Sequence, residues 1–151
     1  MKANRQISPK LTLAELQAWL QTQSIDTTNW DHADAKSVAD LLTELQHGES
    51  TLHSDPPLRR VRVVEVLIRN ANKILIEQEQ HFADGRVRLR NRPPSEKMHP
   101  DETPLAAAQR CLSEELALSA DAITFPPQQI PVRTVCDESG SYPNLTSEYC
   151  F

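Results

Sequence analysis

The segment of residues 102–118, which is predicted to contain an amphipathic helix, constrains the fold of this chain more than any other feature. Thr103 and Pro104 mark the start of the helix, because threonine caps helix N-termini and proline suits the first helical turn. At roughly 3.6-residue spacing, one face collects the apolar side chains of Leu105, Ala108, Leu112 and Leu116. Glu114 points away from that face. The helix therefore needs a second layer that covers its apolar side.

The residues before this helix are predicted to supply that layer as β-strands. Residues 59–69 and 73–80 are rich in β-branched side chains and read as two strands. Asp84-Gly85 is a hairpin-type turn, and an alternating third strand follows over residues 86–92. A proline-rich loop then leads to the helix. The order strand, strand, strand, loop and helix indicates an α+β fold.

Charged residues stand at fixed intervals around the helix. Glu102, Arg110, Glu114 and Glu115 follow the spacing E-x7-R-x3-E-E. On a helix, Arg110 and Glu114 are surface neighbours, and Glu115 lies on the flank together with Cys111. Two adjacent carboxylates can bind a hard cation such as Mg²⁺, which prefers oxygen ligands. Without further context, however, a Glu-Glu pair in a helix is usually a solvated surface feature.

This spacing resembles the second half of the Nudix box, G-x5-E-x7-R-E-U-x-E-E-x-G-U, in which U is a bulky aliphatic residue. The resemblance implies a Nudix-like α/β/α sandwich with a mixed sheet and, if the chain is active, a Nudix-type pyrophosphohydrolase. It implies that Glu102 and Arg110 belong to the catalytic set and that Glu114 and Glu115 hold Mg²⁺ or Mn²⁺. The metal would neutralise a diphosphate and activate water.

The box departs from the family pattern at three positions. Glu96 and Ala117 replace its two glycines, and Cys111 replaces the glutamate that follows the arginine. A thiol is a poor Mg²⁺ ligand, so metal binding and catalysis should be weakened, whereas a Glu102–Arg110 brace between loop and helix should persist. Cys111 itself is interpreted as a packed, inert thiol rather than a redox or soft-metal site, because no second cysteine or histidine lies nearby in a ligand pattern.

The strand over residues 86–92 carries four arginines. If alternation is strict, Arg86, Arg88, Arg90 and Arg92 share one face. Guanidinium groups bind phosphate in bidentate fashion, so Arg86, Arg88 and Arg90 are candidate ligand-binding residues for a phosphorylated molecule. The alternative is that these arginines pair with the glutamates of the facing strand, Glu77 and Glu79.

The N-terminal region is predicted to form a short helical segment over residues 1–55. One helix is expected over residues 11–23, where Thr12 and Glu15 form a capping box, and a second over residues 33–46, followed by a linker at 50–57. The helices should pack on the sheet or bind a partner. Together with the Gly48–Ser50 and Ser95–Lys97 motifs, the pair resembles a small group of Nudix-like proteins of photosynthetic organisms, a resemblance that implies no activity.

The second segment, residues 58–151, is the expected Nudix-like domain. Its last predicted strand covers residues 145–151, so the domain is either abbreviated or continues beyond this sequence. A sheet that ends there exposes an edge strand, which favours pairing with a partner chain.

Composition limits the possible functions of the 151-residue chain. The net charge of −5 argues against general nucleic-acid binding. Three cysteines form no disulfide framework, which fits a reducing, cytoplasmic setting, and the absence of an 18-residue apolar run argues against a membrane protein.

Three functions stay open on the sequence alone. The first is a non-catalytic or regulatory module that binds a phosphorylated small molecule or a protein partner. The second is a weak Mg²⁺-dependent hydrolase of nucleoside diphosphate-linked compounds. The third is a structural subunit of a larger assembly.

Overall fold

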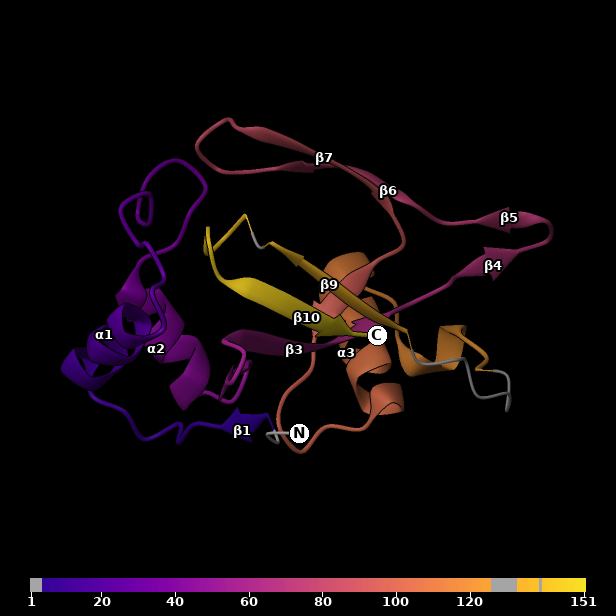
Figure 1. Ribbon diagram of the computed structural model, residues 1–151. Helices are drawn as coiled ribbons and strands as arrows, with labels where there is room; N and C mark the ends of the chain where they lie inside the picture. Colours follow the sequence, from indigo (N-terminus) through magenta and orange to yellow (C-terminus); the bar gives the residue numbers. More distant parts are fainter. Residues whose placement is uncertain (1–3, 126–132, 139) are drawn as a thin grey trace. The chain divides into compact units, whose positions relative to one another are not determined.

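The computed structural model describes residues 4–125, 133–138 and 140–151 (Figure 1). The chain is an α+β protein with a mixed sheet, which confirms the expected fold class at that level. It divides into two compact units, the first made of Met1–Arg62 with Pro131–Phe151 and the second of Val63–Ile130. The boundary expected at residue 55 lies inside the first unit. Among the described residues, no helix has the length and apolar character needed to cross a membrane.

The first unit is built on a sheet with the strand order β1-β2-β3-β10-β9. Its strands are β1 (Arg5–Gln6), β2 (Thr51–Ser54), β3 (Leu58–Glu65), β9 (Thr134–Glu138) and β10 (Thr146–Cys150). Neighbouring strands are antiparallel except β3 and β10, which run parallel with Ser147 opposite Arg59. The predicted C-terminal strand is therefore present as β10, and it lies inside the sheet with β9 outside it.

Two capped helices belong to the same unit. In α1 (Leu13–Thr22), Thr12 and Glu15 form the predicted capping box, with hydrogen bonds of 3.2 and 2.9 Å. The second helix, α2 (Val38–Gln46), begins five residues later than expected, because Ser37 caps it and forms a second capping box with Asp40. The prediction of a helix from residue 33 was wrong, since it overlooked this local cap.

The predicted linker over residues 50–57 was also wrong. Thr51–Ser54 forms β2, which pairs with β3 so that Leu52 lies opposite Arg59. Leu52 is fully buried. The Asp55-Pro56-Pro57 sequence connects these two antiparallel strands.

The helices α1 and α2 pack on the sheet, which was one of the two arrangements expected from the sequence. Their apolar faces share one core with β2 and with the segment before β10: Leu16, Leu20, Ile25, Trp30, Leu41, Leu45, Leu52, Tyr142 and Leu145. Burial of this apolar surface is the main force that holds α1 and α2 in place.

A buried ionic network crosses this core. The Glu44 carboxylate accepts hydrogen bonds from Arg59 at 2.8 and 3.3 Å, from Tyr142 at 3.0 Å, from Lys36 at 2.9 Å and from Ser50 at 3.2 Å. The Arg59 guanidinium also lies 4.9 Å from the centre of the Tyr142 ring. Burial raises the pKa of Tyr142 well above its ordinary range. Each nitrogen of the Arg59 guanidinium and each oxygen of the Glu44 carboxylate has a hydrogen-bond partner, so the burial of these two charges is tolerated.

The second unit contains short strands and one long helix. Val63–Glu65, the end of β3, pairs with β8 (Ser95–Lys97). Two separate hairpins are formed by β4 (Arg69–Asn70) with β5 (Lys73–Ile74) and by β6 (Glu77–His81) with β7 (Val87–Arg92). The helix α3 spans Pro104–Leu116, and a 3-10 turn follows at Ala120–Ala122. The strands expected at 59–69 and 73–80 are therefore shorter and interrupted.

The core of the second unit lies along α3. Its buried members are Val66, Ala108, Cys111 and Leu112, with Ala107 buried as well. Leu105, predicted to be in the core face, is 51% exposed. The buried stripe is thus rotated toward Cys111, which the prediction placed on the flank.

Candidate functional site around Arg110

The helix α3 presents the charged residues of the box. Thr103 caps it by accepting a hydrogen bond from the Ala106 N–H at 3.2 Å, and Pro104 occupies the first turn, as predicted. The helix ends at Leu116, and the residue that caps its C-terminus, Ala117, has φ 52° and ψ 32°. This left-handed conformation is the one that glycine adopts most readily. An alanine therefore fills a position whose backbone suits the glycine of the family pattern.

Arg110 is the centre of the site. Its Nε donates to Glu102 Oε1 at 2.9 Å and its Nη2 donates to Glu102 Oε2 at 3.1 Å, a bidentate pair. Nη2 also donates to the Lys97 carbonyl oxygen at 2.8 Å, and Nη1 donates to Glu114 Oε2 at 3.3 Å. One guanidinium therefore ties together β8, the loop before α3 and the helix itself.

Glu102 is held from two sides. Besides Arg110, the His99 N–H donates to Glu102 Oε2 at 2.9 Å. The Arg110 hydrogen bonds, followed by the one from His99, lower the pKa of Glu102 to about 2. The carboxylate stays ionised well into the acid range. These contacts also raise the pKa of Arg110.

Glu96 lies in the same cluster, although the sequence marked it only as a lost glycine. Its Oε1 is 4.0 Å from Arg110 Nη1. Burial raises the pKa of Glu96, and the nearby negative charges of Glu115 and Glu114 raise it further, while Arg110 opposes them. Its place on β8 opposite Val64 brings it to the helix. A three-residue strand gives too little periodicity for this contact to be predicted.

Cys111 occupies the centre of the second unit's core. Its side chain is fully buried and the thiol is free, which confirms the interpretation of a packed thiol. Burial, with smaller contributions from Glu96, Glu115 and Glu77, raises its pKa to about 11. Cys111 is therefore a protonated thiol packed with Val66, Ala108 and Leu112.

Glu114 and Glu115 are the predicted metal ligands, and both are exposed on α3. Glu114 already accepts a hydrogen bond from Arg110. Within the described part of the chain, no group of three or more histidine, cysteine, aspartate or glutamate side chains is arranged to hold a metal ion.

The arginine strand does not have the geometry that strict alternation predicts. In the β6–β7 hairpin, Glu79 lies opposite Leu89 and Glu77 lies opposite Arg92, so β7 contains one extra residue between these pairs. Asn91 takes the left-handed conformation at this bulge, with φ 48°. Paired residues share a face, so Arg92 lies on the face of Leu89 rather than with Arg88. The prediction of four arginines on one face was wrong.

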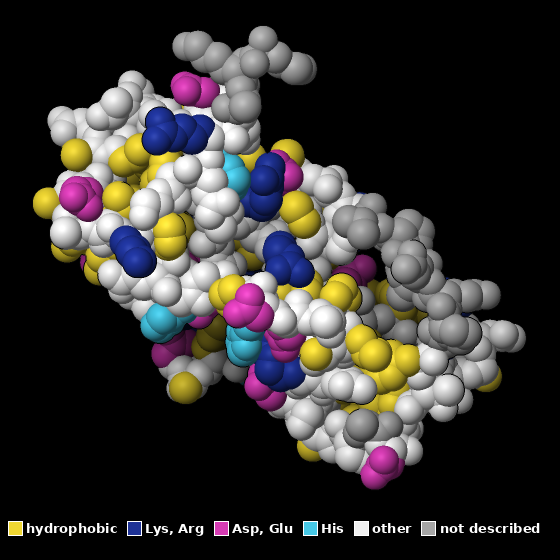
Figure 2. Space-filling view, turned by 90° about the horizontal axis from the view of Figure 1, so that it is seen from below, with side chains coloured by type: hydrophobic (Ala, Val, Ile, Leu, Met, Phe, Trp, Pro, Cys, Tyr) yellow, Lys and Arg dark blue, Asp and Glu magenta, His cyan; other side chains and the backbone are white. Residues whose placement is uncertain are grey.

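The candidate ligand-binding arginines are partly occupied. Arg90 Nε is 3.4 Å from Glu77 Oε2, which is the pairing foreseen as the alternative. Arg86 donates to Asp84 Oδ2 at 2.7 Å and stacks on the Phe82 ring. Arg88 is exposed and lies opposite Gln80. Figure 2 shows basic and acidic side chains scattered among apolar and uncharged ones on one face of the molecule.

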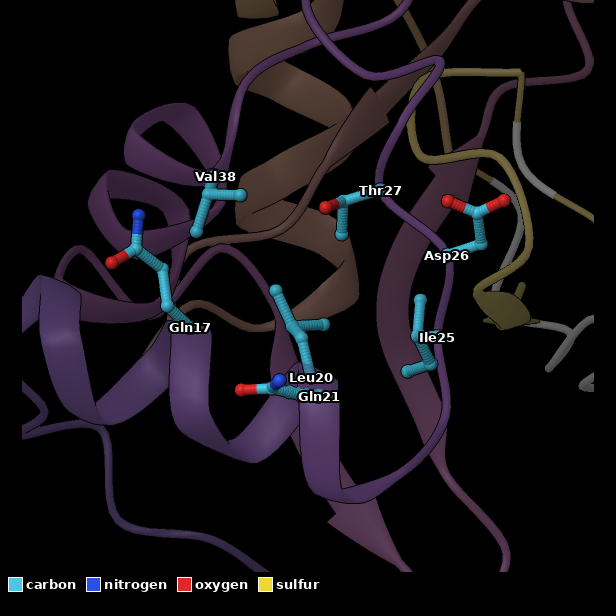
Figure 3. Close-up of a pocket in the computed structure, with 7 residues that line it drawn as sticks. All are labelled: Gln17, Leu20, Gln21, Ile25, Asp26, Thr27 and Val38. Atoms are coloured by element: carbon cyan, nitrogen blue, oxygen red, sulfur yellow. The ribbon is translucent and has the colours of Figure 1, made fainter.

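A hollow in the first unit contains none of the predicted site residues. It encloses about 350 Å³ and lies between α1, residues 25–27 and the start of α2 (Figure 3). Leu20 and Ile25 are buried, whereas Gln17 and Gln21 are exposed. The Asp26 carboxylate at its border already accepts hydrogen bonds from Thr28.

Comparison of the chain with protein-family models, with curated proteins and with solved structures finds no match. The assignment of a function therefore depends on the geometry described above.

Proposed function

We propose that this chain is a Nudix-like binding module in which the box segment is a structural scaffold and no longer a catalytic site. The observation that carries the proposal is that, of two adjacent residues, Arg110 is held by the protein itself and Cys111 is packed in the core. Arg110 has hydrogen bonds to three groups of the protein, and Cys111 is fully buried. The buried side chain at position 111 could bind a metal at the surface only if the core around it were unpacked.

The ligand we favour is a phosphorylated small molecule at the β6–β7 hairpin. Arg88 is exposed on β7, Arg86 directly precedes that strand, and Arg90 lies within the bulge between Leu89 and Arg92. Arginine suits phosphate because its planar group forms two parallel hydrogen bonds. The pairing of Arg86 with Asp84 and of Arg90 with Glu77 weakens this support, because a phosphate must compete with both carboxylates.

A protein partner is the second candidate ligand, and a separate observation favours it. The hairpins expose large apolar side chains: Ile74 at 45%, Ile76 at 52%, Val87 at 54% and Leu89 at 68%. Exposed apolar patches are typical of surfaces that bind other proteins. The three free cysteines agree with the reducing, cytoplasmic setting that we propose for either ligand.

A weak Mg²⁺-dependent hydrolase is the competing function. The proximity of Glu96 to Glu114 and Glu115 favours it, because Glu96 could replace the carboxylate lost at Cys111. Against it, Glu114 already accepts a hydrogen bond from Arg110, and the same guanidinium places a positive charge 4.0 Å from Glu96, which opposes a cation there.

Binding and hydrolysis of one probe separate these functions. Pyrophosphate is titrated into the full chain with EDTA present, and phosphate release is then measured with Mg²⁺ or Mn²⁺. We expect metal-independent binding that Arg88→Gln weakens several-fold and that Arg69→Gln, an exposed arginine of β4, leaves unchanged. Metal-dependent release of phosphate that is lost in Glu114→Gln/Glu115→Gln would instead establish the hydrolase. Binding that Arg88→Gln does not affect would place the phosphate site elsewhere.

A further inference from the structure

The strand β9 forms an open edge of the first unit's sheet. It pairs with β10 on one side, and no other described strand pairs with it (Figure 1). All five of its residues, Thr134–Glu138, are exposed. An exposed edge strand presents unpaired main-chain groups and is a template for the addition of another strand.

The pairing with β10 fixes which main-chain groups face this open edge. Arg133 and Phe151 exchange two hydrogen bonds, N–H of Arg133 to O of Phe151 at 3.1 Å and N–H of Phe151 to O of Arg133 at 2.7 Å. Hydrogen-bonded pairs alternate along an antiparallel ladder, so Val135 and Asp137 also bond toward β10. The N–H and C=O groups of Thr134 and Cys136 therefore point to the open edge, as does the C=O of Glu138, whereas the Glu138 N–H donates to Asp137 Oδ1 at 2.7 Å.

The sequence of this edge is self-complementary in charge. It begins with Arg133 and ends with Asp137 and Glu138, with Val135 between them. A second strand of the same sequence, running antiparallel, brings the basic end of each copy to the acidic end of the other. A parallel copy would instead align equal charges.

Near the middle of β9, only two registers allow the outward-facing main-chain N–H and C=O groups of the two copies to form hydrogen bonds with each other. In one, Val135 faces its own counterpart across the two-fold axis and Arg133 faces Asp137 on both sides. In the other, Cys136 faces its counterpart and Val135 faces Asp137. The first places two ion pairs around an apolar pair, and the second opposes valine to a carboxylate. Charge and apolar matching both select the first.

We propose that β9 pairs antiparallel with β9 of a second copy of this chain, in the register centred on Val135. The contact is isologous and closed, so it yields a dimer and not a filament. In the single chain, the Arg133 guanidinium lies 4.6 Å from the centre of the Phe151 ring. A rotation of this long side chain suffices to reach Asp137 of the other copy, because directly opposed residues have Cβ atoms about 5 Å apart. This inference does not depend on the ligand proposed above.

Sedimentation velocity over a range of protein concentrations tests the proposal. We expect a concentration-dependent species of twice the 17.0 kDa chain mass. Asp137→Arg and Arg133→Asp should each weaken dimerisation at least tenfold. Either substitution places two like charges opposite each other at both 133–137 contacts of the dimer. The double variant Arg133→Asp/Asp137→Arg should restore dimerisation. Asp121→Arg makes the same charge change at an exposed residue outside β9 and should have no effect.

Thiol cross-linking tests the register. In a Cys136→Ser/Cys150→Ser background, Val135→Cys should give a covalent dimer when oxidised glutathione accepts the two electrons and two protons of the introduced thiols. The wild-type chain should not cross-link through Cys136. A chain that stays monomeric at all concentrations, or a dimer insensitive to Asp137→Arg, would overturn the proposal. Cross-linking through native Cys136 but not through Val135→Cys would overturn the register. Circular dichroism and the melting temperature of each variant show whether it is folded.

Discussion

Arg110 and Glu102 form a bidentate ion pair, with two nitrogen–oxygen distances of 2.9 and 3.1 Å, between the helix α3 and the loop that precedes it. The same guanidinium reaches the Lys97 carbonyl at 2.8 Å. Three consecutive elements of the second unit are thus joined at one side chain. In such a scaffold, the role of Arg110 is to stabilise the second unit.

Replacement of Arg110 by lysine should destabilise the protein. An ammonium group cannot form the bidentate pair and reach the Lys97 carbonyl at the same time. We expect the melting temperature to fall by roughly 3–6 °C, which corresponds to the loss of one charge-assisted hydrogen bond at the lower end of its usual strength. Arg88→Lys, at an exposed arginine of β7, is the control and should change it by less than about 1 °C. Equal effects of the two substitutions would remove the special role of Arg110.

The acid stability of the chain should depend on Glu102. Its pKa is lowered from the ordinary value of 4.5 to about 2 in the folded state, so the unfolded chain binds more protons between these values. The stabilisation from the charged carboxylate is therefore present above pH 4.5 and is lost as the pH falls toward 2. Melting temperatures measured between pH 6 and pH 2.5 should fall more steeply for wild type than for Glu102→Gln. Parallel curves would contradict the shifted pKa.

Introduction of a glutamate at position 111, as in the Nudix pattern, should destabilise the second unit rather than create an enzyme. Cys111→Glu places a carboxylate among Val66, Ala108 and Leu112 without a charged partner in the core. We expect a loss of roughly 3–5 kcal/mol in the free energy of unfolding, the range seen when a buried charge is left unpaired. Cys111→Ala is the control and should cost less, because it only leaves a small cavity. A stable Cys111→Glu variant would mean that this side of α3 is accessible to water.

The C-terminus of α3 should be improved by glycine. Ala117 has φ 52°, a conformation that alanine adopts only with strain. Ala117→Gly should raise the free energy of unfolding by about 0.5–1 kcal/mol. The same substitution at Ala106, inside the helix and exposed, should lower it by a similar amount. Urea denaturation of both variants measures the change in the free energy of unfolding, which should be positive for Ala117→Gly and negative for Ala106→Gly. A destabilised Ala117→Gly chain would show that the left-handed turn is not a source of strain.

Local signals in the sequence predicted the elements that depend on neighbouring residues. The capping box of Thr12 with Glu15 and the threonine-proline start of α3 were identified because each involves residues at most three positions apart. The buried nature of Cys111 followed from the general behaviour of free cysteines.

Features that depend on distant residues could not be read from the sequence. The network between Glu44, Arg59 and Tyr142 joins α2, β3 and the segment before β10, and no local pattern marks it. The bulge at Asn91 arises from pairing with β6, so the alternation of arginines was misleading. Glu96 reached the Arg110 cluster only through the pairing of β8 with β3.

Titration calorimetry of Mg²⁺ and Mn²⁺ into the full chain, alone and with ADP-ribose, tests the scaffold account most directly. The proteins compared are wild type, Glu114→Gln/Glu115→Gln and the control Asp121→Asn. The account predicts no saturable metal binding in any of the three, with or without ADP-ribose. Saturable binding in wild type and in the control that is lost in the double variant would contradict it, because Glu114 and Glu115 would then hold a metal as in an active box.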